Sequence, residues 1–245
     1  YQMRLGRNGN KLYLLFGSMH GIYDKGYFLI DGINYYSLSN DTQKIEVCDF
    51  AFPKEQSLSL CIPQSPLFTY QPTSIRNLSS DRYKDMTLNV QVNKNLIDFY
   101  NTYPTSEVNG NFMTRWAMYA NTPMEQKVQK QLYPILQEKI ADLNEHDAAN
   151  KLLNWVQTAF VYEYDDKVWG HDRAFFAEET LFYPYCDCED RSILFTRIVR
   201  DLLGLKCILI YYPGHLASTV FRTLSAAHIP TKPSLHHLAG ILAYP

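Results

Sequence analysis

The 245-residue sequence lacks several features that would point to particular classes of protein. No apolar run approaches the roughly 20 residues that a membrane-spanning helix requires, so we expect no membrane span. Acidic and basic residues nearly balance at a formal charge of −2, which gives no reason to expect nucleic acid as a partner. The five cysteines form an odd, sparse set rather than a disulfide framework. The composition is that of a globular protein with a sizeable core.

The chain opens without an initiator methionine and without a signal-peptide pattern. Tyr1 leads directly into a strand-like segment. We therefore expect a processed protein or a part of a longer one. The sequence leaves the compartment open and only slightly favours an extracytoplasmic location.

Residues 1–121 are predicted to form a β-rich N-terminal region. The dipeptide Asp31-Gly32 lies between two apolar segments and can adopt the positive φ angles of a tight hairpin. Ser57–Leu60 and Met86–Val92 alternate between apolar and polar residues. This period of two predicts strands that turn one face toward a core.

Residues 122–245 are predicted to combine helices with a few strands, which gives the whole chain the α+β class. Thr122-Pro123 provides the hydroxyl cap and the first-position proline of a helix start. Apolar residues at helical spacing predict two further helices, and a run that is apolar on both faces predicts a central strand. The expected elements are a helix from Thr122, helices over 148–160 and 190–203, and strands over 205–212 and 216–221.

Two residues of this second region have the surroundings of a thiol–imidazole pair. Cys188 lies near the expected start of a helix, where unpaired N–H groups and the helix dipole favour a thiolate. His215 lies at the expected start of the last strand. An antiparallel sheet packed on that helix would bring the two together, and such a pair activates sulfur for acyl transfer.

Three carboxylates flank the sulfur in the sequence. Asp187, Glu189 and Asp190 would raise the pKa of the Cys188 thiol if they faced it. However, the next two residues of a helix point about 100° and 200° away, and acids suit a first helical turn. We therefore expect the dipole and His215 to prevail and to make Cys188 the most reactive thiol of the chain.

The residues around both side chains resemble a known superfamily. Cys186–Ser192 (CDCEDRS) resembles the block that opens the nucleophile helix of bacterial transglutaminase-like cysteine peptidases, and Tyr211–Ala217 (YYPGHLA) resembles their histidine strand. Residues 156–165 and 176–181 are similar to the lead-in helix and to the loop before the cysteine. The resemblance covers about residues 150–221, and its specificity comes from the block, the strand and the spaced histidine together.

This resemblance implies a papain-like core in which a helix bearing the cysteine packs on an antiparallel sheet. It implies that Cys188 attacks a peptide or carboxamide carbonyl while His215 takes the thiol proton and passes it to the leaving amine. The acyl group would then go to water, as in a cysteine peptidase or amidase, or to an amine, as in a transamidase. The implied partner is a peptide or protein substrate, and neither a cofactor nor a metal is expected.

The chain departs from the family pattern in two places. Cys186 stands where the family has a small residue. The family carries an Asp or Asn on the strand after the histidine to orient the imidazole, but no Asp, Glu, Asn or Gln follows His215. The composition also changes from about residue 222, which we interpret as an altered terminus. Asp172 is a candidate for orienting the imidazole, and Trp169 is a candidate oxyanion donor or substrate wall.

Other interpretations of the same residues stay open. The chain could keep the fold without turnover and bind a glycan, a peptide or a protein partner. Cys186, Cys188 and His215 could bind zinc. The segment 169–172 could be a packed aromatic loop with a surface histidine. The remaining cysteines lie in apolar runs and are expected in the core: Cys48, Cys61 and Cys207.

Overall fold

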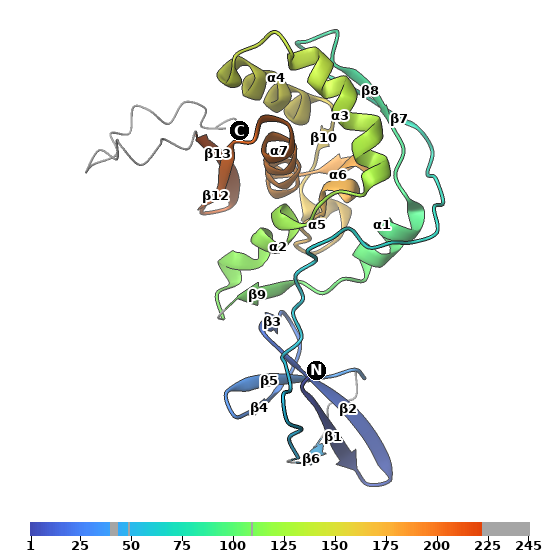
Figure 1. Cartoon of the computed structure of the whole chain (residues 1–245), viewed down its shortest axis with the longest axis vertical. Helices are drawn as coiled ribbons and strands as arrows, with labels where there is room; N and C mark the ends of the chain where they lie inside the picture. Colours follow the sequence, from blue (N-terminus) through green and yellow to red (C-terminus); the bar gives the residue numbers. More distant parts are fainter. Residues whose placement is uncertain (40–43, 49, 109, 222–245) are drawn as a thin grey trace, which may run out of the picture. The chain divides into compact units, whose positions relative to one another are not determined.

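The computed structural model describes residues 1–39, 44–48, 50–108 and 110–221. The chain divides into two compact units, each built from two stretches of sequence. Unit 1 comprises Tyr1–Cys61 and Tyr103–Met118, and unit 2 comprises Ile62–Thr102 and Tyr119–Pro245. Strands dominate unit 1, and unit 2 combines helices with short sheets (Figure 1), so the predicted α+β class is confirmed. The predicted altered terminus lies outside the described residues.

Unit 1 contains a five-stranded antiparallel sheet with the strand order β4-β5-β2-β1-β6. Tyr13, Leu15 and Tyr35 are buried on one face of this sheet. A two-stranded sheet pairs β3 with β9. The elements are β1 (Met3–Asn8), β2 (Lys11–Ser18), β3 (His20–Ile22), β4 (Phe28–Ile30), β5 (Ile33–Ser37), β6 (Glu46–Val47), β9 (Ser106–Val108), the 3-10 turn η1 (Phe112–Thr114) and α2 (Arg115–Asn121), whose last residues belong to unit 2.

Turn chemistry predicted one hairpin of this unit correctly. Ile30 pairs with Ile33, and Asp31 and Gly32 between them have φ angles of 49° and 79°. The strand predicted over Ser57–Leu60 is wrong, because this segment forms only a single parallel bridge, between Leu58 and Ser18. Within the described residues, its backbone bonds to Gly17 and Met19 at Leu58 alone, and the segment joins none of the sheets.

Unit 2 places short two-stranded sheets around a set of helices. The antiparallel pairs are β7–β8 and β12–β13, and β10 pairs with β11 in parallel. The elements are β7 (Arg76–Ser79), β8 (Thr87–Val90), α1 (Lys94–Asn101), α3 (Gln126–Ile140), α4 (Glu145–Thr158), β10 (Val161–Tyr162), α5 (Asp165–Val168), α6 (Ala177–Phe182), β11 (Tyr185–Cys186), α7 (Cys188–Leu203), β12 (Lys206–Tyr212) and β13 (His215–Phe221).

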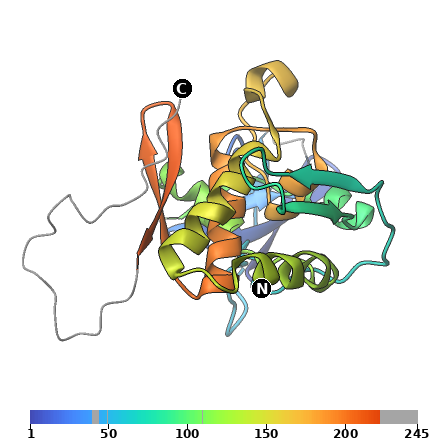
Figure 2. The ribbon, with the colours of Figure 1, turned by 90° about the horizontal axis from the view of Figure 1, so that it is seen from above.

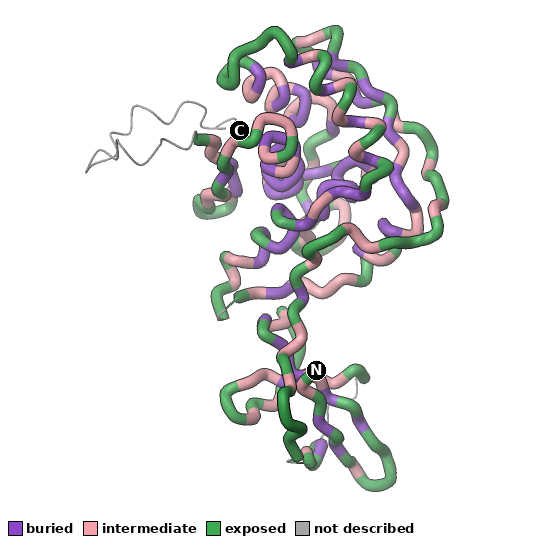
Figure 3. Tube along the Cα trace, viewed as in Figure 1, coloured by how far each residue is buried: buried purple, intermediate pink, exposed green. Residues whose placement is uncertain are grey.

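Helix α7 is the central element of unit 2. Its N-cap residue Asp187 accepts a hydrogen bond from the Glu189 N–H, and Asp190 completes a capping box with the Asp187 N–H. Gly204 ends the helix at a φ angle of 64°, a left-handed conformation that glycine adopts without steric cost. The helix packs against α4, α6 and the β12–β13 hairpin, which lies beside it in Figure 2. Buried residues cover most of its length (Figure 3).

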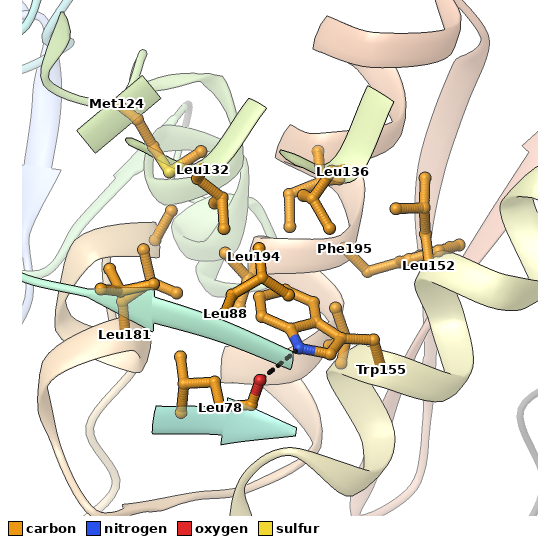
Figure 4. Close-up of a cluster of buried hydrophobic side chains, with 14 of the residues drawn as sticks. Leu78, Leu88, Met124, Leu132, Leu136, Leu152, Trp155, Leu181, Leu194 and Phe195 are labelled. Carbon is orange, nitrogen blue, oxygen red and sulfur yellow. Dashed lines mark hydrogen bonds between the residues drawn. The ribbon is translucent and has the colours of Figure 1, made fainter. Parts of the chain in front are cut away.

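The core of unit 2 joins these helices to the β7–β8 hairpin. As Figure 4 shows, Trp155 of α4 lies fully buried among leucines and donates its indole N–H to the Leu78 carbonyl of β7 at 3.2 Å. Met86, Leu88, Val90 and Val92 are buried at alternate positions, as the pattern predicted. The predicted strand is therefore confirmed over Thr87–Val90.

Helix starts differ from the predicted ones. The helix expected from Thr122 begins at Gln126, because α2 ends at Asn121 and the Glu125 N–H donates to the buried Glu178 carboxylate at 2.5 Å. The helix expected over 148–160 begins at Glu145, where Asn144 caps it. The third helix begins at Cys188 rather than at Asp190.

The strand over Lys206–Tyr212 is confirmed, but its expected central position is wrong within the part of the chain that the structure describes. There β12 pairs only with β13. Ile208 is accordingly exposed, and at the end of the strand Tyr211 and Tyr212 are exposed on opposite faces. Among the described helices, none has the length and the hydropathy needed to cross a membrane.

Candidate active site

Cys188 occupies the first helical position of α7. The parallel β10–β11 bridge places Cys186 beside Tyr162, and Asp187 then turns the chain into the helix. The side chain is half-buried. At this position the cysteine N–H has no acceptor within its own helix, and the positive end of the helix dipole lies close by.

The edge of β13 runs along the first two turns of α7. The Leu216 N–H donates to the Cys188 sulfur at an N···S distance of 3.4 Å. The Ser192 hydroxyl donates to the Leu216 carbonyl at 3.1 Å, and the Ser218 hydroxyl donates to the Ser192 carbonyl at 2.9 Å. These buried bonds fix the register between strand and helix, so the sulfur lies at the beginning of β13.

His215 is the first residue of β13. The two-residue turn Pro213-Gly214, with a φ angle of 75° at Gly214, places His215 opposite Tyr212. Since the Leu216 nitrogen is 3.4 Å from the sulfur and lies about 2.4 Å from the preceding Cα, the Cα of His215 is within about 6 Å of the sulfur. No hydrogen bond joins the His215 ring to this sulfur in the described chain.

The sulfur has a carboxylate neighbour instead. The Cys188 thiol donates to Oε2 of Glu189 at 3.2 Å. Burial raises the pKa of the Cys188 thiol to about 12, Glu189 and Asp187 add to the rise, and the Leu216 N–H opposes it. The expectation that the dipole and His215 would prevail is therefore wrong for this structure. The helical angle between neighbours does not keep the long Glu189 side chain from folding back to the sulfur.

Glu189 belongs to a cluster of acids. Oxygen atoms of Asp165, Asp172 and Glu189 lie within 4.8 Å of one another, as do those of Asp165, Asp187 and Asp190. Burial raises the pKa of Asp165 to about 6 and the pKa of Asp187 to about 9, and neighbouring carboxylates add to both shifts. The cluster therefore holds protons at neutral pH, and its mutual repulsion disfavours a thiolate beside it.

Three backbone N–H groups hold two of these acids in place. The Arg173 N–H donates to Asp165 at 2.6 Å, and the Phe175 N–H donates to Asp190 at 2.8 Å. The Asp187 N–H donates to the second oxygen of Asp190 at 3.2 Å. The acids thus organise the loop before α6 and the start of α7, and these bonds use oxygen atoms that a cation would need.

The segment 169–172 supplies the other two predicted residues. Asp172 is exposed and lies next to Glu189 and Asp165 in the acidic cluster. The Trp169 ring packs edge-on against Phe175 and Tyr183, with centroid separations of 5.7 and 4.9 Å. The exposed His171 ring lies 3.0 Å from the Trp169 carbonyl oxygen.

The other cysteines separate into two classes. Cys186 is buried and accepts a hydrogen bond from the Arg191 guanidinium at 3.4 Å, and burial raises its pKa to about 12. Cys207 is also buried, as predicted. Cys48 and Cys61 are exposed, so their predicted place in the core is wrong. Both lie outside the strands of unit 1, in its connecting segments.

The zinc site that the sequence left open does not form among the described residues. The sulfur atoms of Cys186 and Cys188 and the ring nitrogens of His215 are not grouped so that they could hold a metal ion together. The position of Glu189 next to Cys188 is evident from the sequence, but the turn of the Glu189 carboxylate toward the sulfur is not.

Comparison of the chain with protein-family models, curated proteins and solved structures finds no match.

Proposed function

We propose that Cys188 and His215 carry out thiol-dependent acyl transfer on peptide or carboxamide substrates, as in a cysteine peptidase, amidase or transamidase. The observation that carries this proposal is the hydrogen bond from the Leu216 N–H to the Cys188 sulfur. This bond holds Leu216, the residue that follows His215, against the Cys188 thiol. The packing of α7 against the β12–β13 hairpin supports a papain/transglutaminase-like core, in which a helix bearing the cysteine lies on an antiparallel sheet.

The reaction starts from a protonated thiol. The Cys188 sulfur attacks the substrate carbonyl while the His215 ring, which must turn toward the sulfur for this step, takes the thiol proton. The S–C bond forms, the C–N bond breaks, and His215 passes the proton to the leaving amine. Water or a second amine then attacks the thioester and releases the acyl group from the sulfur.

The start of α7 can stabilise the oxyanion. The Cys188 N–H lies at a helix N-terminus and is free of an intrahelical acceptor, so it can donate to a developing negative charge. Trp169, held by Phe175 and Tyr183, is our candidate for the substrate wall. Asp172 is our candidate for orienting the imidazole, and its neighbour Glu189 would have to hold a proton for this to be favourable.

A specific observation favours a second function, binding without turnover. The thiol donates to Glu189, and its pKa of about 12 makes the thiolate rare at neutral pH. A chain that keeps the fold in this resting form would recognise a peptide, glycan or protein without cleaving it.

A peptide-library digest separates these two functions. The full chain is incubated with a mixture of peptides and peptide amides, and the products are identified by mass spectrometry with and without a primary amine. We expect released fragments or amine adducts, an acyl adduct on Cys188, and loss of both in Cys188→Ala. Cys186→Ala is the matched control and should keep the activity. Peptide retention without products, equal in the chain and in Cys188→Ala, would support the binding function instead.

A further inference from the structure

Unit 1 contains a contact between a thiol and an imidazole. The Cys61 sulfur is 3.8 Å from Nε2 of His20. His20 is buried and Cys61 is exposed, so the imidazole is sheltered while the cysteine faces solvent. The Ser59 hydroxyl lies 3.4 Å from the same ring nitrogen and accepts the Cys61 N–H at 3.2 Å.

The backbone brings these residues together. Leu58 and Ser18 form a parallel bridge, and the Met19 N–H donates to the Leu58 carbonyl at 2.9 Å. Because the two segments run in the same direction, the residues that follow them are neighbours as well, which places Cys61 beside His20. The Tyr103 hydroxyl donates to the Leu60 carbonyl at 2.5 Å and holds the residue before the cysteine.

The imidazole is in the form that accepts a proton. Burial lowers the pKa of His20, so the ring is neutral at pH 7 and one of its nitrogens carries a lone pair. His20 lies on β3, which pairs with β9. The backbone N–H of His20 donates to the Ser18 hydroxyl at 3.0 Å. The ring is therefore held in position as a general base for the thiol next to it.

We propose that Cys61 and His20 form a modification site, at which small electrophiles, and hydroperoxides in particular, react first with this protein. The Cys61 sulfur attacks one peroxide oxygen, so that an S–O bond forms and the O–O bond breaks. Sulfur is oxidised to a sulfenic acid and the peroxide is reduced. His20 takes the thiol proton and delivers it to the leaving oxygen, which departs as water or as an alcohol.

The chain contains a matched control for this reaction. Cys48 is also an exposed thiol of unit 1, and in the described part of the chain no hydrogen bond joins its sulfur to a histidine. The reduced full chain is treated with hydrogen peroxide and the sulfenic-acid trap dimedone, and adducts are counted by mass spectrometry against time. A parallel series uses iodoacetamide. With both probes we expect Cys61 to react on the order of tenfold faster than Cys48 and faster than Cys188. Equal or slower reaction at Cys61 would overturn the proposal.

A substitution tests the part played by the imidazole. In His20→Asn the rate at Cys61 should fall to that of Cys48, whereas His146→Asn, which removes an exposed histidine, should leave both rates unchanged. An undiminished advantage at Cys61 in a folded His20→Asn protein would contradict the role of His20. If the variant does not fold, the comparison of Cys61 with Cys48 in the unaltered chain still decides the proposal.

Discussion

The backbone N–H of Leu216 donates a hydrogen bond to the sulfur of Cys188, and this bond joins the start of β13 to the start of α7. A donor at the sulfur favours the thiolate, but burial and the Glu189 carboxylate favour the thiol. The thiol form prevails, since the pKa of Cys188 is raised to about 12. The backbone therefore places the proposed nucleophile, while the electrostatic environment of the site keeps its thiol protonated.

Glu189→Gln should make Cys188 more reactive. Glutamine keeps the size and the acceptor oxygen of the side chain but removes a negative charge beside the sulfur, so the pKa of Cys188 should fall. We expect iodoacetamide to label Cys188 at least about threefold faster at pH 8, as measured by mass spectrometry. Glu138→Gln, a change at an exposed carboxylate of α3, should leave the rate unaltered. An equal or lower rate in Glu189→Gln would show that the carboxylate does not control the thiol.

Asp190→Asn should destabilise unit 2. Asp190 is fully buried, and its two oxygens accept the N–H groups of Phe175 and Asp187. Asparagine presents an NH₂ group to one of these donors, which leaves a buried N–H without an acceptor and costs about 1–3 kcal/mol. Urea unfolding followed by circular dichroism measures this loss. Asp98→Asn, at an exposed ion pair of α1, should change the unfolding free energy by less than about 0.5 kcal/mol. Similar values for the two variants would contradict the role of Asp190.

Local rules were enough to predict some elements. The Asp31-Gly32 hairpin follows from turn chemistry, and the strand within Met86–Val92 follows from its alternating pattern. The last helix also ends at Leu203 as predicted, since Gly204 after it adopts the left-handed conformation that such an end requires. In each case the signal lies within a few neighbouring residues.

Contacts between distant segments could not be predicted in this way. The helix expected from Thr122 begins later because Glu178, some fifty residues further along, binds the Glu125 N–H. Cys61 was assigned to the core because its neighbours are apolar, whereas a single bridge at Leu58 leaves its sulfur exposed beside His20. Such placements depend on tertiary packing, which periodicity does not encode.

Arg76→Lys should weaken the link between β7 and α6. The Arg76 guanidinium donates to the carbonyls of Leu181 and Tyr183 at 2.8 and 2.5 Å, and these lie at or just beyond the end of α6, where helical partners are lacking. Both bonds come from the Nη1 nitrogen, and lysine keeps the charge but has a side chain one bond shorter, so its ammonium does not reach the same point between the two carbonyls. We expect a loss of about 1–2 kcal/mol in the unfolding free energy, measured in urea. The matched change at an exposed arginine, Arg82→Lys, should be near neutral, and an equally neutral Arg76→Lys would refute this link.

The last prediction concerns pH. Burial raises the pKa of Glu178 to about 7 and that of Asp165 to about 6, above the values near 4 of an unfolded chain. The folded state then binds more protons than the unfolded state, so the contribution of these groups to stability is complete below about pH 4 and is lost as the pH rises toward 7. Carboxylates whose pKa is lowered, such as Asp85, have finished titrating by pH 5.5 and do not oppose this change.

We therefore expect a lower melting temperature at pH 7.5 than at pH 5.5, measured by calorimetry. His20, whose pKa is lowered by burial, acts in the opposite direction, so the decisive quantity is the difference between the chain and Glu178→Gln. Glutamine keeps the oxygen that accepts the Glu125 N–H but cannot ionise, and the fall in melting temperature should be smaller in this variant. Glu138→Gln, at an exposed position, should keep the full pH dependence. If Glu178→Gln shows the same fall as the unaltered chain, the buried Glu178 carboxyl is not its source.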